Sequence, residues 1–227
     1  MDHKIDGQTL SRSDLVALLK SAAGADLVLE TCALDEADLS NLDLNGLRFE
    51  RCSFKGTDFT GAQLEQARFS GCRGAMANFT ATRLDASTWR SSDLNNARFT
   101  GASLSEAVFT GCKLTGADFS RSRHVGARFV ETTLASARLP SFSFRKQTLE
   151  TLDFSHADLA GSDFRDAVLD NCSLRESHLV DARFDNADLR GADLGGLRLN
   201  DARLFKGATI SRAQAGALLA ELGLKVI

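Results

Sequence analysis

The sequence contains one proline, no tyrosine and no long apolar run. What it lacks excludes several classes of protein. No apolar segment approaches the ~18 residues that a membrane-spanning helix needs. The N-terminal stretch has neither the basic nor the apolar region of a signal peptide. The five cysteines form no Cys-x-x-Cys pair. Their odd number favours a reducing compartment, so we expect a cytoplasmic protein that does not bind membranes.

Strong charge of one sign and recognisable catalytic motifs are also missing. The chain has 30 acidic and 27 basic residues, a net charge of −3, which does not favour direct binding to nucleic acid. The four histidines are not arranged with serine or cysteine in a known triad order, and there is no phosphate-binding loop or zinc-ligand spacing. The sequence therefore predicts no enzymatic activity, no cofactor and no metal site.

What the sequence does contain is a five-residue repeat. Steps of five in both directions from Phe119 give 36 positions between Leu29 and Leu204, here called centres. Thirty-four of them are Leu, Phe or Trp, and the exceptions are Gly74 and His124. The residue two before each centre is mostly small. Neither an α-helix, which repeats at about 3.6 residues, nor a strand, which repeats at about 2, explains this period.

The charged residues indicate which positions face inward. Residues 27–206 contain 25 acidic and 22 basic side chains, and none lies at a centre or two residues before one. Because an unpaired buried charge is costly, both columns should point inward. A chain that turns a corner in every pentad closes a four-sided coil after four pentads, and successive coils pair as parallel β-structure. The remaining three positions of each pentad are expected to face outward without constraint.

This pattern, as in the stretch Ala157-Asp158-Leu159-Ala160-Gly161, resembles the pentapeptide-repeat family. The resemblance implies an all-β solenoid, a right-handed quadrilateral β-helix. We expect an N-terminal cap with a short helix at 1–26 and about nine coils of four pentads each at 27–206. A C-terminal helix and strand should follow at 207–227.

The core should be built from the centres. Trp89 belongs to it, and the space at Gly74 should be filled by Met76 or by neighbouring residues. His124 is expected either to bond to the backbone or to turn outward. All five cysteines fall in one column, one coil or several whole coils apart, where buried small side chains are favoured over a disulfide or metal ladder. The phenylalanine centres predicted to be buried are Phe49, Phe54, Phe59, Phe69, Phe79, Phe99, Phe109, Phe119, Phe129, Phe154, Phe164 and Phe184.

The two ends of the chain have similar sequences. The stretch GQTLSR at 7–12 returns as GATISR at 207–212, an offset of ten whole coils. Ser11 and Ser211 are suitable helix N-caps, and Asp14 completes a capping pattern with Ser11. We expect helices at about 12–22 and 212–222 that cover the end coils.

One stretch, residues 139–154, departs from the pattern. Three successive small positions there hold Phe142, Gln147 and Leu152, so the coil is expected to bulge. Arg145 and Lys146 lie on this stretch and are candidate contacts for a partner.

The C-terminal segment resembles that of the Qnr-like group of pentapeptide-repeat proteins. This resemblance implies a DNA-mimicking homodimer that binds DNA gyrase or topoisomerase IV and protects it against quinolones or peptide toxins. The alternative is a general interaction scaffold with a different protein partner. The candidate dimer-interface residues are Ala215, Leu218, Leu219 and Leu222, and the similar N-terminal helix is the alternative dimer contact. The candidate acidic partner contacts are Asp35, Glu36, Asp38 and Asp58.

Overall fold

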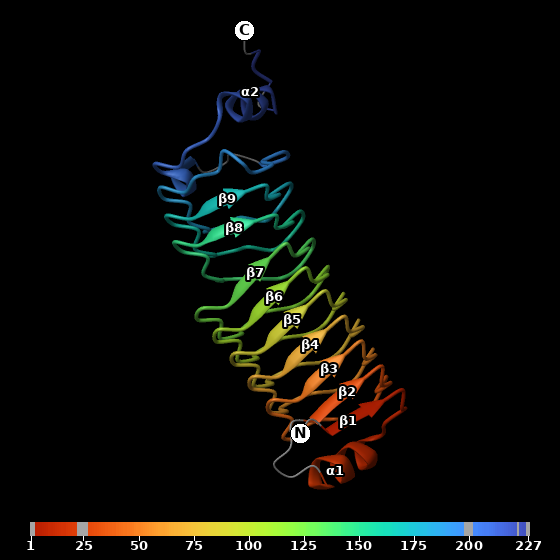
Figure 1. The fold of residues 1–227 in the computed structure, drawn as a ribbon. Helices are drawn as coiled ribbons and strands as arrows, with labels where there is room; N and C mark the ends of the chain where they lie inside the picture. The colour runs from red at the N-terminus through yellow and green to blue at the C-terminus, as the bar shows by residue number, and fades with distance from the viewer. Residues whose placement is uncertain (1–2, 22–26, 198–201, 222, 226–227) are drawn as a thin grey trace. The chain divides into compact units, whose positions relative to one another are not determined.

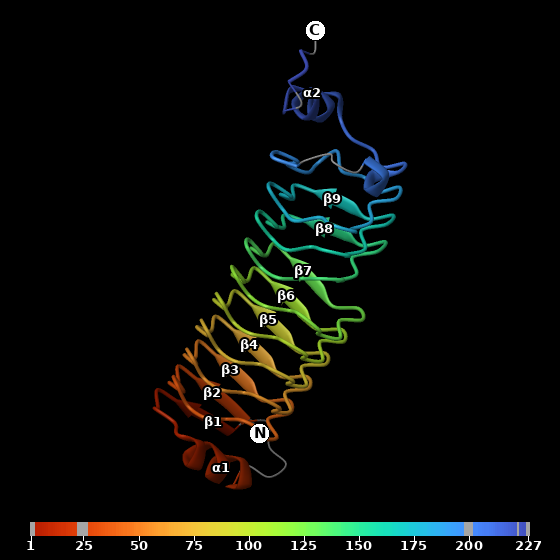
Figure 2. The same cartoon turned by 180° about the vertical axis from the view of Figure 1, so that it is seen from behind.

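The computed structural model describes residues 3–21, 27–197, 202–221 and 223–225 (Figure 1). It falls into two compact parts, an N-terminal unit (Met1–Phe129) and a C-terminal unit (Val130–Ile227). Within each unit short parallel strands recur once per coil, and the coils that carry them are stacked (Figure 2). The predicted parallel β-solenoid with helices at both chain ends is confirmed.

The N-terminal unit begins with a strand and a helix and continues as regular coils. Its sheet has the strand order β1 to β7, all parallel. Each neighbouring pair from β2 to β6 is offset by four pentads, as in the pairing of Phe49 with Phe69. The elements are β1 (His3–Asp6), α1 (Arg12–Ser21), β2 (Leu27–Glu30), β3 (Arg48–Glu50), β4 (Arg68–Ser70), β5 (Thr88–Arg90), β6 (Val108–Thr110) and β7 (Arg128–Val130), the last lying at the unit boundary.

The C-terminal unit contains a two-stranded parallel sheet and ends in helical segments. Strand β8 (Thr148–Glu150) pairs with β9 (Val168–Asp170), again with an offset of four pentads. A 3₁₀ helix, η1 (Ala202–Phe205), precedes helix α2 (Arg212–Glu221).

Each coil has four sides because a turn follows each centre. The N–H of Thr57 bonds to the carbonyl of Phe54 at 3.3 Å and closes one such turn. Between turns, Ser53 donates to Cys32 on the preceding coil, and Phe54 donates to Arg73 on the following coil. The backbone groups of each side are therefore paired above and below, which satisfies the need of buried peptide groups for hydrogen bonds.

The residue two after each centre forms the corner of the coil. The sequence predicted that this position is unconstrained, but its backbone conformation is restricted. It lies in the left-handed region, with φ of 56° at Asn41, 60° at Met76 and 59° at Lys146. Glycine adopts this conformation without steric cost, whereas other L-residues lose about 1 kcal/mol or more. The glycines of this column, such as Gly56 with φ of 62°, therefore meet a backbone requirement that hydrophobic patterning does not reveal.

The interior is filled by the centres. All twelve phenylalanines named above are buried, with exposed fractions of 3% or less. Many stack on the ring one coil away, as Phe99 does on Phe119 with centroids 4.8 Å apart. Trp89 is fully buried and stacks on Phe69 at 3.7 Å, and its Nε1–H donates to Ser87 Oγ.

The two exceptions among the centres are accommodated differently. A Cβ added to Gly74 would overlap the ring of Phe54, so this ring occupies the space that a larger centre would need. Of the two predicted alternatives, a neighbouring residue fills the gap and Met76 does not, because Met76 is 66% exposed. His124 is half-buried, and its Nδ1 lies 3.1 Å from the carbonyl oxygen of Ser122, in agreement with the predicted backbone bond.

The five-residue register holds through most of the described residues but slips by one residue near the end. Asp188 pairs with Thr209, which lies one position beyond the partner that four pentads would give. As a result Phe205 stacks on Phe184 with centroids 4.9 Å apart, and the predicted centre Leu204 is only half-buried. The slip falls between Leu194 and Phe205, a stretch that includes residues outside the described ranges.

The matching ends of the chain are consequently not ten regular coils apart. Near the N-terminus Thr9 pairs with Ala33, which lies further along the chain than one regular coil, because α1 is inserted between them. At the other end Thr209 pairs with Asp188. The sequence echo therefore reflects two similar helix starts and not an unbroken repeat.

Both helices begin as the capping pattern predicts. Ser11 N–H donates to Asp14 Oδ2 at 2.9 Å, and Asp14 N–H donates to Ser11 Oγ at 3.3 Å. The N–H of Ser211 donates to Gln214 Oε1 at 2.6 Å, and the N–H of Gln214 returns a bond to Ser211 Oγ. These reciprocal bonds satisfy backbone donors that the first turn leaves open.

Residues 139–154 keep the register of the C-terminal unit. Arg138 and Ser143 pair with the equivalent residues of the next coil. Phe142 and Leu152 are buried at positions where small residues are usual, and Phe142 contacts Phe144 with centroids 4.9 Å apart. The larger side chains thus enter the interior without disturbing the pairing of the coils, and a bulge here stays a prediction.

Candidate partner-binding surfaces

The predicted acidic contacts lie together on two coils of the N-terminal unit. Residues 27–66, here called the acidic coils, carry eight acidic and three basic side chains, a net charge of −5. Asp35, Glu36 and Asp38 are exposed, and Asp58, on the next coil, is half-buried. Asp38 and Asp58 are paired neighbours in one outward column.

Several of these carboxylates also hold the backbone in place. Asp35 Oδ1 accepts bonds from Ser53 Oγ at 2.6 Å and from Lys55 N–H at 2.8 Å. Asp58 Oδ1 accepts from Thr60 N–H and from Asn78 Nδ2. Bonds from Ser40 lower the pKa of Asp38, with a smaller contribution from the nearby Arg12 guanidinium. These groups are therefore fixed in position, which reduces the entropy lost when a partner binds.

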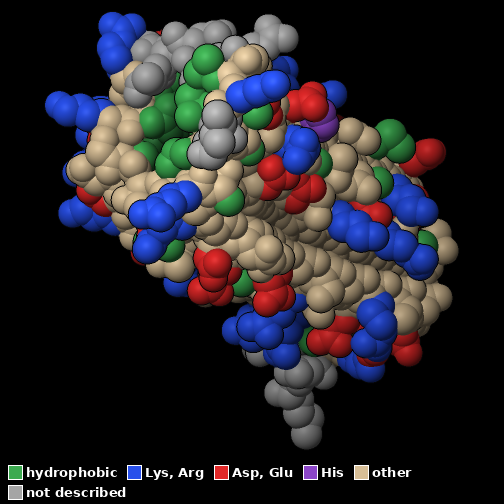
Figure 3. Space-filling model, turned by 90° about the horizontal axis from the view of Figure 1, so that it is seen from above, with side chains coloured by type: hydrophobic (Ala, Val, Ile, Leu, Met, Phe, Trp, Pro, Cys, Tyr) green, Lys and Arg blue, Asp and Glu red, His purple; other side chains and the backbone are tan. Residues whose placement is uncertain are grey.

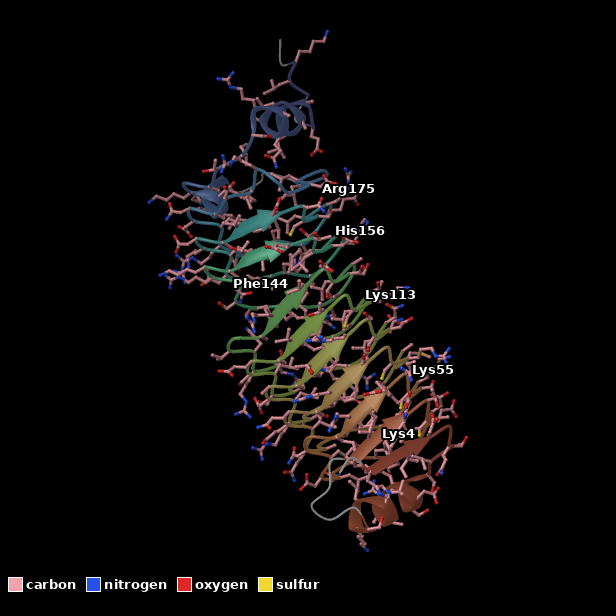
Figure 4. All side chains as sticks on the ribbon, in the orientation of Figure 1. Lys4, Lys55, Lys113, Phe144, His156 and Arg175 are labelled. Carbon is pink, nitrogen blue, oxygen red and sulfur yellow. The ribbon has the colours of Figure 1, made fainter. Side chains whose placement is uncertain are left out.

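The rest of the N-terminal unit has the opposite charge. Residues 67–129, here called the arginine-rich coils, carry nine basic and four acidic side chains, a net charge of +5. Figure 4 shows Lys113, one of these basic residues, projecting outward from its coil. The small net charge of the whole chain therefore conceals two regions of strong and opposite charge.

The remaining predicted contacts, Arg145 and Lys146, lie on an exposed corner of the C-terminal unit. Arg145 Nε is 3.8 Å from Asp166 Oδ2. Arg145 and Lys146 therefore belong to the C-terminal unit, whereas the acidic coils belong to the N-terminal unit.

Several charged side chains of the C-terminal unit form ion pairs with neighbours. Arg190 makes two bonds to Asp188, at 2.9 and 2.6 Å, and lowers the pKa of that carboxyl to about 2. Arg175 binds Asp193 on the next coil at 2.9 Å. Arg165 with Asp163, Arg183 with Asp185 and His178 with Asp158 form further pairs. This unit therefore presents alternating, paired charges.

The C-terminal helix anchors itself to the last described coil. Gln214 Nε2 donates to the carbonyls of Leu189 and Ala192, both at 2.7 Å, and the N–H of Gly196 donates to Glu221 Oε1. These three contacts fix the orientation of α2 within the C-terminal unit.

The candidate dimer residues on this helix differ in exposure. Leu218 is buried, Ala215 is half-buried and Leu219 is 38% exposed, whereas Leu222 lies outside the described residues. Leu224 and Ile210 are also exposed. Figure 3 shows a group of hydrophobic side chains gathered on one face of the molecule. The expected strand after α2 is absent at the described residues Leu224 and Lys225.

The titratable side chains form no metal-binding group among the described residues. No cluster of three or more His, Cys, Asp or Glu side chains in that part of the chain is placed to hold a metal ion. His156 Nδ1 is 3.5 Å from Glu176 and makes an isolated pair. No helix among these residues is long and apolar enough to cross a bilayer.

The five cysteines are buried free thiols and do not form a disulfide ladder. The thiols of Cys52 and Cys72 donate to carbonyls on the preceding coil at 3.2 and 3.3 Å. Burial raises the pKa of Cys52 to about 12 and that of Cys72 to about 11. Such thiols are poor nucleophiles and metal ligands at neutral pH.

Sequence reasoning missed the separation of charge, although the signal was present. Counting charge over the whole repeat region, or over each of the four sides, averages the acidic and arginine-rich coils together. A count along the coil axis, one or two coils at a time, would have shown the change of sign near residue 66.

The fold is a parallel β-solenoid whose outward positions carry its charged side chains. The pentapeptide-repeat region model matches residues 43–119, and the model for pentapeptide repeats (8 copies) matches 112–146, 149–177 and 167–204. The chain belongs to the pentapeptide-repeat family. No curated protein matches it.

Solved structures with a similar fold include two of QnrB1, a plasmid-mediated fluoroquinolone resistance protein. A trypsin-treated form is 24% identical with a TM-score of 0.65, and the alignment covers 88% of this chain and 100% of that one. The full-length form is 21% identical with a TM-score of 0.58, covering 99% of this chain and 100% of that one. At these identities the likeness shows the fold.

Proposed function

We propose that this protein is a non-catalytic binder of DNA gyrase or topoisomerase IV that acts in the bacterial cytoplasm and protects its partner against a quinolone or a peptide toxin. The observation that supports it most is the concentration of fixed carboxylates on the acidic coils, on a fold similar to that of the fluoroquinolone resistance protein QnrB1. The enzyme's DNA-binding surface, which must be cationic, is the site that this region suits.

The charge density of the acidic coils is close to that of DNA. Two coils rise about 10 Å at ~4.8 Å per coil. Duplex DNA of that length carries about six phosphate charges at one per ~1.7 Å. The acidic coils carry a net −5. Mimicry by charge is therefore a property of residues 27–66, whereas the full chain, at −3, is far too weakly charged for it.

A supercoiling assay tests this proposal. Purified gyrase is measured with increasing amounts of the protein, with and without ciprofloxacin. We expect the protein to inhibit supercoiling at high concentration or to restore it in the presence of the drug, and both effects should weaken at high salt because exposed charges are screened. If micromolar protein does neither, a scaffold with a different protein partner replaces this proposal.

A matched pair of variants assigns the effect to the acidic coils. The first carries Asp35→Asn, Glu36→Gln, Asp38→Asn and Asp58→Asn, which remove charge but keep oxygen acceptors for the backbone bonds. The control carries Glu131→Gln, Glu150→Gln, Asp170→Asn and Asp181→Asn, exposed acids of the C-terminal unit. The first set should abolish the effect on gyrase and the control should retain most of it. Equal losses would contradict a role for the acidic coils.

We also propose that the protein forms a homodimer through the C-terminal segment. Ile210, Leu219 and Leu224 are exposed apolar side chains near α2, whereas Leu218 on the same helix is buried. A self-complementary contact would cover the exposed set. Leu219→Glu should therefore convert a dimer into a monomer in light scattering while circular dichroism shows that the variant stays folded, and Ser13→Glu on α1 is the control. A monomeric wild-type protein would refute the proposal.

A further inference from the structure

The arginine-rich coils carry charges that have no counterpart within the described structure. Arg68, Arg90 and Arg128 are exposed on β4, β5 and β7, and none of them forms an ion pair with a described residue. In the C-terminal unit, by contrast, arginines such as Arg175 and Arg190 are paired. Both units have the same type of coil, so the difference does not follow from the fold.

The three arginines share one face of the sheet of the N-terminal unit. Arg68 lies in the column of Thr88 and Val108, and Arg90 lies in the neighbouring column, between Ser70 and Thr110. The outward residues of β4 to β7 include no acid. Acidic residues of these coils, such as Asp85, lie elsewhere, where Asp85 accepts bonds from Ser103 and Ser105.

The arrangement of this face suits an extended chain of carboxylates. From β4 to β7 the sheet spans about 14 Å at ~4.8 Å per strand. On an extended polypeptide, side chains on one side recur at about 6.7 Å, so two or three alternate carboxylates reach across the same span. Arginine binds carboxylates through two parallel hydrogen bonds. Ser70, Thr88 and Thr110 lie on the same strands and carry hydroxyls.

Other anionic partners fit this face less well. Single-stranded nucleic acid is bound by basic grooves with exposed aromatic rings. The phenylalanines and the tryptophan on the strands of the N-terminal unit are buried, and the sequence has no tyrosine. A duplex would meet a flat sheet that has no helix or loop to enter a groove. A DNA-binding surface of a protein would repel the arginines because it is itself cationic.

We propose that the β4–β7 face, centred on Arg68, Arg90 and Arg128, binds an acidic polypeptide segment of a partner protein. The proposal does not depend on the identity of the partner suggested above. It assigns the two charge regions to different contacts, since acidic coils and arginine-rich coils cannot both face one cationic surface.

A binding measurement with a defined acidic probe tests the proposal. Full-length protein is titrated into a short fluorescein-labelled oligoglutamate peptide, and anisotropy is followed at low and at physiological salt. The test variant carries Arg68→Gln, Arg90→Gln and Arg128→Gln. The matched control carries Arg165→Gln, Arg175→Gln and Arg190→Gln, which remove the same charge from paired sites of the C-terminal unit. Circular dichroism confirms that both variants are folded.

The proposal expects the test variant to bind the peptide about tenfold more weakly, a loss of about 1.4 kcal/mol. The control should change less than about twofold. A wild-type protein that does not bind oligoglutamate at low salt, or equal losses in both variants, would overturn the proposal. So would tighter binding of a labelled DNA duplex of similar net charge, since the face would then be a nucleic-acid surface.

Discussion

The N-terminal and C-terminal units have the same kind of interior but differ in how they distribute charge. In the N-terminal unit the acidic coils and the arginine-rich coils follow each other along the stack, with net charges of −5 and +5. In the C-terminal unit acids and arginines alternate and pair, as in Asp188 with Arg190. The interior positions of both units are uncharged. The comparison shows that the coil constrains which residues face inward and leaves the outward charge pattern free to vary.

The interiors of the two units are packed differently at one pair of equivalent centres. In the C-terminal unit Phe154 is followed one coil later by Leu174, and both are fully buried. In the N-terminal unit the equivalent residues are Phe54 and Gly74, and the ring of Phe54 takes the space of the missing side chain. Two packing solutions therefore exist for one column of the same coil.

A charge placed in the interior should have the largest effect, and an equal one in both units. Phe99→Asp and Phe164→Asp each remove a fully buried ring and bury a carboxylate without a partner. We expect each to lose more than about 4 kcal/mol of unfolding free energy, measured by denaturant titration. Thr115→Asp, at an exposed position, is the control and should be near neutral. If one unit tolerated the buried charge, the interiors would not be equivalent.

Replacing Gly74 with leucine, the usual residue type at a centre, should cause the next largest loss of stability. Gly74→Leu forces its side chain against the ring of Phe54, and such overpacking typically costs about 1–3 kcal/mol. Adding Phe54→Leu should recover much of this loss because the smaller side chain frees the space. A lower melting temperature for the double variant than for Gly74→Leu alone would show that the ring is not what fills the gap.

Alkaline pH should destabilise the N-terminal unit more than the C-terminal unit. Burial raises the pKa of Cys52 to about 12 and those of Cys72 and Cys112 to about 11. In the unfolded chain these thiols ionise near pH 8.5. The unfolded state therefore loses protons first, and stability present below about pH 8.5 declines as the pH rises towards 11, by up to ~1.4 kcal/mol per pH unit for each thiol.

A cysteine-to-alanine series separates this effect from other alkaline titrations. Melting temperatures between pH 7 and about pH 10.5 should fall less steeply when Cys52, Cys72 and Cys112 are all changed to alanine. Cys172→Ala, in the C-terminal unit, removes a single thiol whose pKa is also raised by burial, and its slope should change less. Identical slopes in all three proteins would show that the thiols do not control the alkaline loss.

Substitutions of exposed arginines should have the smallest effect on stability, and the effect should differ between the two units. Arg68 lies opposite Arg48 on the neighbouring strand, and like charges at such positions repel. Arg68→Thr should therefore stabilise the protein by about 0.5 kcal/mol or less. Arg190→Thr should lower the melting temperature slightly, because it removes a bidentate partner of Asp188. High salt should shrink both changes, and changes of the same sign would contradict the contrast between the units.

Much of the fold could be predicted because the five-residue pattern is local and repeats. The centres, the small positions before them, the capping serines and the buried cysteines all follow from residue type at fixed spacing. The candidate contacts were harder to predict. Asp35, Glu36, Asp38 and Asp58 do lie together, but Arg145 and Lys146 belong to a different unit, and the unpaired state of Arg68 or Arg90 depends on neighbours one coil away.

By itself the sequence determined which side chains face inward, because a buried charge costs too much free energy for any other arrangement of this repeat. Three features were decided only by tertiary structure. The corner residues take positive φ because four turns must close each coil. Phe54 fills the space at Gly74 because the two stack one coil apart. The register moves by one residue near the C-terminus, so that Phe205 and not Leu204 stacks on Phe184. The last two depend on contacts between residues about one coil apart in the chain, which no local pattern records.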